Sequence, residues 1–176
     1  RAKLDEALAL LQRYTGADSM DSASAHLARA DYHITRGDLP AALADTESAH
    51  ASFVAKLGEA HPYSRRAEAL LGEVLLRRGD GTGLDRLQQA IAGLREAGPS
   101  GVPYLAAGLC QSALAQRTSA PADALRDARE CLSLRIARLG ATHWETAQAQ
   151  ALAASLEPAS AARADTIDTA LARMRA

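Results

Sequence analysis

Residues 79–83 are the part of the sequence that looks most like a phosphate-binding loop, because they read Gly-Asp-Gly-Thr-Gly. Such a loop needs a preceding strand, and a helix N-terminus or a lysine directed at the phosphate. Here the run follows a helical pattern. The tripeptide Arg-Gly-Asp at 78–80 also occurs at the matching place one repeat earlier, at 36–38. We therefore interpret both segments as turns that end helices.

Histidines offer a second kind of candidate chemistry. His26 and His33 lie seven residues apart on one face of a helical pattern, close to Asp31, whereas zinc sites on a helix typically place ligands at i and i+4. We predict neither a metal nor a cofactor. His61 and His143 stand at the same place in two matching segments, 57–62 and 139–144. We expect each of these two rings to bond a neighbouring helix end.

The two cysteines, Cys110 and Cys131, lie at similar distances on either side of a predicted turn near Ala120. A contact between them is conceivable, but two cysteines do not make a disulfide framework. We expect two buried, reduced thiols that pack as small hydrophobic side chains. Neither cysteine has a base beside it in the sequence, and no other enzyme signature is present. The chain is therefore not expected to be an enzyme.

Composition narrows the fold and the partners. Hydrophobic residues make up 48% of the 176 residues but aromatic residues only 3%, so the apolar content is mostly alanine and leucine, which favour helices. The 20 basic and 21 acidic residues show no basic excess, which disfavours nucleic acid as a partner. No apolar run is long enough to insert into a membrane. The chain opens in a helical pattern without an initiator methionine, and we interpret it as part of a longer, cytoplasmic protein.

Glycines divide the chain at a regular interval. Those at positions 16, 58, 98 and 140 are almost evenly spaced, and each follows a helical stretch, where glycine is the expected stop. The segment 57–62 also recurs at 139–144. A period of about 41 residues that contains two helices predicts an all-α array of stacked helix pairs.

We predict one domain over residues 1–176, with a leading helix in 1–15 and repeats in 19–57, 61–97, 102–139 and 143–175, the last of which ends in a capping helix. The expected helices are 3–14, 19–36, 39–57, 61–78, 82–97, 102–118, 121–139, 143–156 and 159–175. Two helix starts, at Thr82 and Thr142, have the layout of a capping box.

Side-chain size and polarity along the repeats carry further expectations. Small residues recur at matched places, where they let helices approach closely; they are Ala30 and Gly72, then Ala42, Gly83 and Ala124, then Ala49, Ala90 and Cys131. Four polar residues stand where the pattern is usually apolar: Arg29 and His33 in the first repeat, Ser112 and Gln116 in the third.

The most specific pattern lies in residues 57–79. It reads Leu-Gly-x-x-His-Pro at 57–62, Leu-Gly-x-x-Leu at 71–75, and then Gly79; a similar pattern spans 139–156. It resembles the tetratricopeptide repeat (TPR), in the longer variant found in kinesin light chains and many bacterial proteins. The stretch 131–147 is also similar to repeats attached to bacterial serine/threonine kinases. The resemblance covers nearly the whole chain and implies a right-handed superhelical solenoid of about four helix pairs. The third junction, 98–103, departs from it by lacking the leucine and the histidine.

The resemblance also implies a function: a protein–protein interaction module whose first helices line a concave groove that binds a peptide or partner-protein segment. The groove residues expected to contact the partner are Asp31, Ile34, Arg66, Glu73, Leu76, Arg77, Leu114, Arg117 and Gln148, with Leu27 as a further apolar contact. Arg66, Arg77 and Arg117 are the expected anchors, because arginine pairs with carboxylates through two parallel hydrogen bonds. The alternative for each arginine is an ordinary solvated helix face.

Two other roles fit the sequence. The chain could be a sensory or regulatory domain of a larger bacterial enzyme, such as a serine/threonine kinase, whose own segment docks in the groove. It could also self-associate through the end that carries the leading helix.

Overall fold

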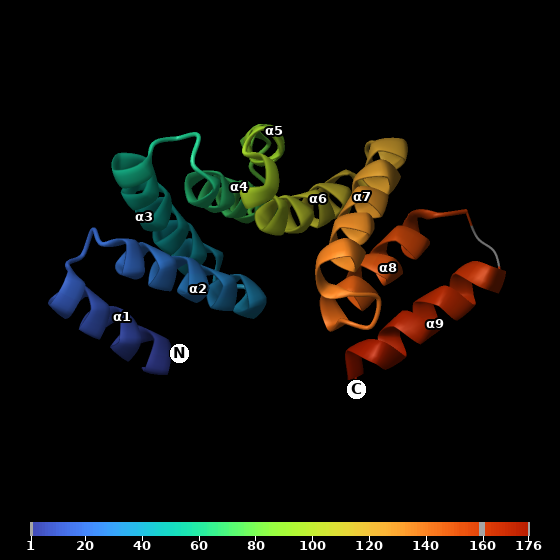
Figure 1. Cartoon of the computed structure of the whole chain (residues 1–176), viewed down its shortest axis with the longest axis horizontal. Coiled ribbons are helices and arrows are strands. Elements are labelled where there is room, and N and C mark those ends of the chain that lie inside the picture. Colours follow the sequence, from blue (N-terminus) through green and yellow to red (C-terminus); the bar gives the residue numbers. More distant parts are fainter. Residues whose placement is uncertain (1, 159–160, 176) are drawn as a thin grey trace. The chain divides into compact units, whose positions relative to one another are not determined.

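The chain is helical apart from its turns in the computed structural model, which describes residues 2–158 and 161–175 (Figure 1). The elements are α1 (Ala2–Thr15), α2 (Met20–Arg36), α3 (Leu39–Leu57), α4 (Pro62–Arg77), α5 (Thr82–Glu96), the short 3-10 helix η1 (Gly98–Ser100), α6 (Val102–Gln116), α7 (Pro121–Leu139), α8 (Trp144–Leu156) and α9 (Ala161–Arg175). Every expected helix is present, with bounds within two residues of those expected. Residues 159 and 160, where the last helix was expected to begin, lie outside the described residues.

The chain divides into two compact units, and each is described by itself. Unit 1 comprises Arg1–Gly101 and contains α1 to α5; unit 2 comprises Val102–Ala176 and contains α6 to α9. Within each unit, every helix packs against the helices that precede and follow it in the sequence. This order of packing is the one that a repeat of helix pairs requires. The single domain over 1–176 stays a prediction.

The junctions at Gly58 and Gly140 are two copies of one local structure. Both glycines have positive φ, at 83° and 84°, with ψ at 163° in each. At both junctions the histidine that follows is the N-cap residue, and its Nδ1 accepts a hydrogen bond of 3.2 Å from a backbone N–H. The expectation that His61 and His143 bond a helix end is confirmed. A ring nitrogen thus satisfies one of the donors that every helix start leaves open.

A buried hydroxyl closes the same junction from the other side. Ser64 donates to the carbonyl of Gly58 at 2.7 Å, and Thr146 donates to that of Gly140 at 2.9 Å. Ser22 does the same for Gly16, at 2.8 Å. The third junction has Tyr104 at this position and forms η1 instead, which agrees with its departure from the sequence pattern.

Both expected capping boxes are wrong. The cap of α8 is His143, one residue after Thr142. The cap position of α5 is Gly81, which has no side chain, and the N–H of Thr82 donates to Asp80 at 3.0 Å. In each case a neighbouring side chain already accepts from the helix start, so the threonine is not needed.

Gly58 and Gly37 are expected to respond differently to asparagine. Gly37 has φ 74° and ψ 11°, the left-handed helical region that asparagine tolerates. Gly58 combines φ 83° with ψ 163°, a region that is essentially restricted to glycine. Gly58→Asn should therefore lower the free energy of unfolding by about 1–3 kcal/mol. Gly37→Asn should change it by less than about 0.5 kcal/mol.

Urea denaturation of the two variants measures this difference. A Cβ at either glycine would meet no atom within 4 Å, so backbone conformation alone separates the two positions. Equal losses of stability would contradict the role given to ψ at the junction.

The core of unit 1 lies where α2, α3 and α4 meet. Its largest members are Leu27, Ile34, Phe53, Leu70 and Val74, packed with alanines from all three helices. On its other side α4 packs against α5 through Gly72 and Gly83, at each of which an added Cβ would lie under 3.0 Å from backbone atoms of the other helix. The predicted close approach at these two small residues is confirmed.

In unit 2, α6 and α7 are joined by a disulfide between Cys110 and Cys131, so the prediction of two reduced thiols is wrong. Both residues occupy small-residue positions of the repeat, and the two helices pass so close there that their Cα atoms lie 5.7 Å apart. That separation is typical of disulfides.

Candidate functional site

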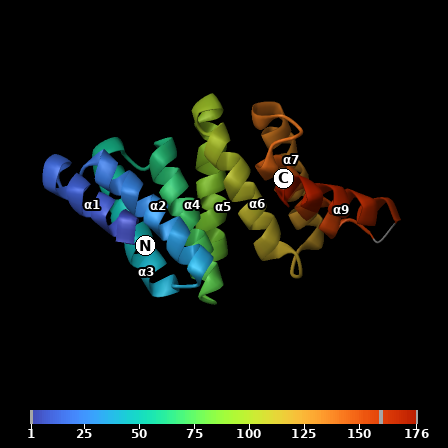
Figure 2. The same ribbon diagram turned by 90° about the horizontal axis from the view of Figure 1, so that it is seen from below.

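The predicted groove residues of unit 1 come from the first helices of two successive pairs, α2 and α4, which are neighbours in Figure 2. Asp31 on α2 is exposed to solvent. Even so, desolvation by the protein around it raises the pKa of its carboxyl group, an effect that the charge of Arg66 on α4 partly offsets. Asp31 and Arg66, on the first helices of successive pairs, therefore lie close enough to interact electrostatically.

In the last turn of α4, Glu73 and Arg77 form an ion pair of 2.8 Å. The Glu73 side chain is 14% exposed, whereas that of Arg77 is 51% exposed. Leu76, beside Arg77, is partly buried. The pair thus joins a largely buried carboxylate to a guanidinium that solvent still reaches.

Two of the expected apolar contacts in unit 1 belong to the core. Ile34 is only 8% exposed, and Leu27 is fully buried; both pack in the cluster formed by α2, α3 and α4. Ile34 therefore offers little surface to a partner. Ile34 was assigned to the groove by counting back from Gly37 at the end of α2. The side of α2 that carries Ile34 faces α3 and α4.

In unit 2 the predicted groove residues are Leu114, Arg117 and Gln148. Leu114 is 48% exposed and Arg117 is exposed at the end of α6. Gln148 on α8 is exposed too, and its side-chain oxygen accepts a hydrogen bond of 3.1 Å from Arg135 on α7.

Arg135 is a buried charge that sequence reasoning did not single out. It stands at the repeat position that Phe53 and Leu94 fill with apolar side chains, and it is 8% exposed. Burial lowers the pKa of its guanidinium, and the charge of Glu145 partly offsets this. Arg135 also donates to the backbone carbonyl of Glu145 at 2.6 Å. Gln148 thus helps to satisfy a buried cation, besides presenting its amide to solvent.

A buried carboxylate, Asp45, explains the polar residues of the first repeat. Arg29 donates to both of its oxygens at 2.7 Å, and His26 donates through Nδ1 at 2.8 Å. Burial alone would raise the pKa of Asp45, but these hydrogen bonds outweigh it and lower the pKa to about 2. The Nε2 atom of His33 lies 3.9 Å from the same carboxylate.

The third repeat also buries an aspartate, surrounded by two neutral side chains and by Arg126, which donates to it at 3.4 Å. Asp127 occupies the position of Asp45 two repeats later along the chain, and it is also buried. Ser112 donates to it at 2.7 Å, and Gln116 donates to Ser112 at 2.7 Å. The polar residues that broke the apolar pattern of α2 and α6 therefore match a buried aspartate on the following helix. The signal was the shared Ala-Leu-x-Asp at 42–45 and 124–127.

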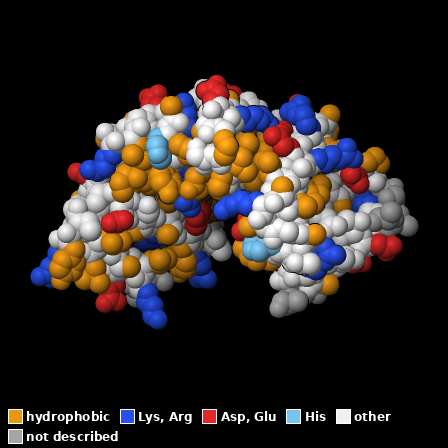
Figure 3. Space-filling view, in the orientation of Figure 1, with side chains coloured by type: hydrophobic (Ala, Val, Ile, Leu, Met, Phe, Trp, Pro, Cys, Tyr) orange, Lys and Arg blue, Asp and Glu red, His pale blue; other side chains and the backbone are white. Residues whose placement is uncertain are grey.

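The described residues contain no group of three or more His, Cys, Asp and Glu side chains placed to bind a metal ion. A search of the same residues for a helix of the length and apolar character needed to cross a membrane found none. Basic and acidic side chains are interspersed over the visible face of each unit (Figure 3).

No protein-family model matches the sequence, and no curated protein matches it. Among solved structures, a crystal structure of nearly identical TPR-like repeats, described as a putative kinesin light chain of Podospora anserina, matches with a TM-score of 0.62. The match has 17% sequence identity and covers 98% of this chain and 82% of the other.

The fold is a TPR-like helical solenoid. Its helices pack in the order that such repeats require, and the predicted resemblance to the longer TPR variant is confirmed at the level of the fold. Stacked repeats of this kind present extended surfaces.

Proposed function

We propose that this TPR-like chain binds an extended or helical peptide segment of a partner protein on the exposed faces of its first helices. The observation that carries the proposal is the pairing of charges across two successive first helices, where exposed Asp31 on α2 interacts electrostatically with partly buried Arg66 on α4. Charged groups of both signs on one surface give a bound peptide a direction and a register, because like charges facing each other are disfavoured.

The last turn of α4 extends this surface by the charged pair of Glu73 and Arg77 and by the apolar side chain of Leu76. Arg77 can bind a carboxylate of the peptide while it stays paired with Glu73, because half of its side chain is in water and a guanidinium has five N–H donors. Leu76 lies beside it for an apolar contact. The peptide that fits unit 1 therefore carries an acidic residue for Arg77 and a basic residue for Asp31, with an apolar residue between them.

Unit 2 offers a second set of contacts on its own first helices. Leu114 is the most exposed large apolar side chain of α6, and exposed Arg117 lies in the turn that directly follows this helix. Gln148 on α8 adds an amide that can bond a peptide backbone. We assign these three residues to a contact surface of unit 2, separate from that of unit 1.

The test begins with selection of peptides from a random display library on the wild-type chain. Their affinity is then measured by fluorescence anisotropy for wild type, for the triple variant Arg66→Glu/Arg77→Glu/Arg117→Glu, and for the control Arg86→Glu. Arg86 is exposed on α5, a second helix. We expect the triple variant to bind at least about tenfold more weakly, a loss of about 1.4 kcal/mol, and the control to bind as wild type does.

Circular dichroism establishes that each variant is folded. A triple variant that is helical and binds the selected peptides with unchanged affinity would contradict the assigned surface. Each selected peptide is checked by competition, in which the unlabelled peptide should displace the labelled one. If no library yields a peptide that passes this check, peptide binding is contradicted.

A further inference from the structure

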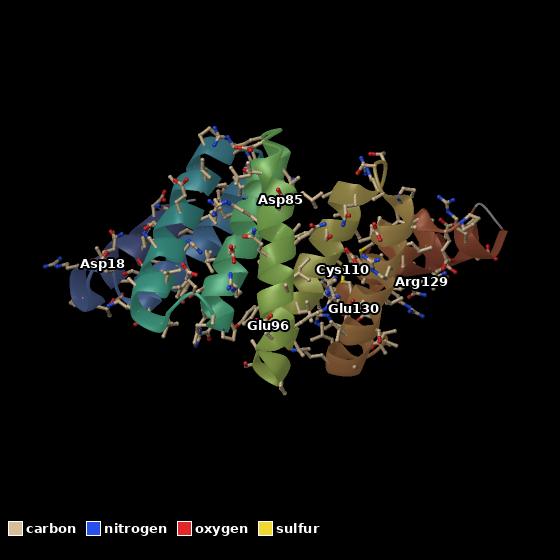
Figure 4. All side chains as sticks on the ribbon, turned by 90° about the horizontal axis from the view of Figure 1, so that it is seen from above. Asp18, Asp85, Glu96, Cys110, Arg129 and Glu130 are labelled. Carbon is tan, nitrogen blue, oxygen red and sulfur yellow. A yellow bond between two sulfur atoms is a disulfide. The ribbon has the colours of Figure 1, made fainter. Side chains whose placement is uncertain are left out.

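The disulfide of unit 2 replaces a pair of alanines in the ordinary repeat. A shift by one repeat places Cys110 over Ala69 of α4 and Cys131 over Ala90 of α5, and both alanines are buried. The repeat thus requires small side chains at this crossing. Two cysteines meet the same requirement, and their sulfurs bond where α6 and α7 pass each other (Figure 4).

One apolar cluster beside α7 is built from small side chains. Where α6, α7 and α8 meet, the buried apolar cluster consists of Ala113, Ala128 and Ala153, with leucines only at its partly buried rim. The corresponding cluster of unit 1 contains buried Phe53, Leu27, Leu70 and Val74. Since stabilisation scales with the apolar area removed from water, this part of unit 2 gains less from its core. A cross-link is the common substitute in small domains.

Buried polar groups also require α6, α7 and α8 to keep a fixed spacing. The Asp127 cluster lies between α6 and α7, and Arg135 lies between α7 and α8, with its Nε buried and without a hydrogen-bond partner. Both depend on the helices keeping their spacing, because a buried charge that loses its partners is costly. A covalent bond between α6 and α7 fixes that spacing.

We infer that the Cys110–Cys131 disulfide is a structural cross-link whose redox state sets the stability of unit 2, and that the chain acquires it in an oxidising compartment and not in the cytoplasm expected from the sequence. Structural disulfides persist in such compartments and are rare where thiols are kept reduced. No cysteine of the chain is left over for another role.

Burial protects the bond once it has formed. Cys131 is fully buried and Cys110 is 9% exposed. A reducing thiolate must reach one of the two sulfurs, so α6 and α7 must first separate. The native chain therefore keeps its disulfide under mild reductant and loses it when unit 2 opens.

The bond forms by thiol–disulfide exchange with a small-molecule or protein disulfide as oxidant. The thiolate of one cysteine attacks the donor disulfide, which gives a mixed disulfide and releases one donor thiol. The thiolate of the other cysteine then displaces the second donor thiol. The two cysteines together lose two electrons and two protons, and the donor disulfide is reduced to two thiols.

The test compares the wild type, oxidised with glutathione disulfide or fully reduced, with the double variant Cys110→Ala/Cys131→Ala. The alanines restore the residues found at these positions in the second repeat. We expect the oxidised wild type to have no alkylatable thiol after unfolding. We expect full reduction to lower its melting temperature by about 10 °C, because the bond closes a loop over a sequence separation of 21 residues.

The double variant separates the cross-link from the packing. Its melting temperature should equal that of the reduced wild type and should not change when reductant is added. Equal melting temperatures for oxidised and reduced wild type, or two alkylatable thiols after treatment with glutathione disulfide, would overturn the structural role. The compartment is tested by acid-quenched alkylation of the full-length protein in its own cells. Two free thiols in that experiment would overturn the proposal of an oxidising compartment.

Discussion

Replacing Gly83 with valine is expected to destabilise unit 1 by about 3 kcal/mol or more, the upper end of the range for overpacking. A Cβ at Gly83 would lie 2.6 Å from the backbone nitrogen of Leu76 and 2.7 Å from the carbonyl oxygen of Gly72. These are backbone atoms of α4, so they cannot move aside unless the whole helix moves. Moving α4 away from α5 separates side chains along the entire crossing. Urea denaturation followed by circular dichroism measures the loss.

Gly81→Ala is the matched control for this effect. Gly81 lies two residues earlier, has φ −62° and ψ −20°, and would place a Cβ in open space. Alanine restricts the unfolded chain, so this variant should be as stable as wild type or slightly more stable. A Gly83 variant that unfolds with the same free energy as the Gly81 variant would show that α4 and α5 do not cross as described.

Asp45→Asn is expected to cost about 3 kcal/mol at neutral pH, because it removes the carboxylate that pairs with Arg29 and with His26 inside the helix pair. Asparagine keeps the size of the side chain, so the loss reports charge and hydrogen bonding. Asp85→Asn is the control, since Asp85 is exposed on α5 (Figure 4) and should change stability by less than about 0.5 kcal/mol.

The same pair of proteins should differ in pH dependence. The pKa of Asp45 is lowered from 3.8 to about 2 in the folded chain. Its ionisation therefore contributes about 2 kcal/mol of stability, which is fully present above pH 4 and is lost as the pH falls through 4 towards 2. The stability gap between wild type and Asp45→Asn should shrink over that window. A gap that stays constant from pH 6 to pH 2 would mean that Asp45 is not an ion-paired carboxylate.

Much of the fold could be predicted from the residues that end and begin the helices. Positive-φ glycines at helix ends, His61 and His143 at helix starts, and Gly72 facing Gly83 can all be read from the regular repeat of the sequence pattern. The capping boxes could not, because a hydrogen bond at a helix start goes to whichever acceptor lies nearest. Asp80 and His143 lie nearer than the two threonines.

The site was harder to predict because it depends on the rotation of each helix about its axis. Ile34 and Leu76 follow the same counting rule, yet Ile34 is buried and Leu76 is partly exposed. The disulfide escaped prediction for another reason. Cys110 and Cys131 fit the small-residue positions whether oxidised or reduced, so only the crossing of α6 and α7 decides that their sulfurs meet. Buried Asp45 and Asp127 needed knowledge of which polar residues on the preceding helix reach them.

The most direct test of peptide binding on the first helices is an NMR titration of the isotope-labelled chain with a selected peptide. The proposal predicts that the largest amide chemical-shift changes in unit 1 fall on α2 and α4, around Asp31, Arg66 and Arg77, with smaller changes on α3 and α5. Changes confined to α3 and α5, with α2 and α4 unaffected at saturation, would contradict it.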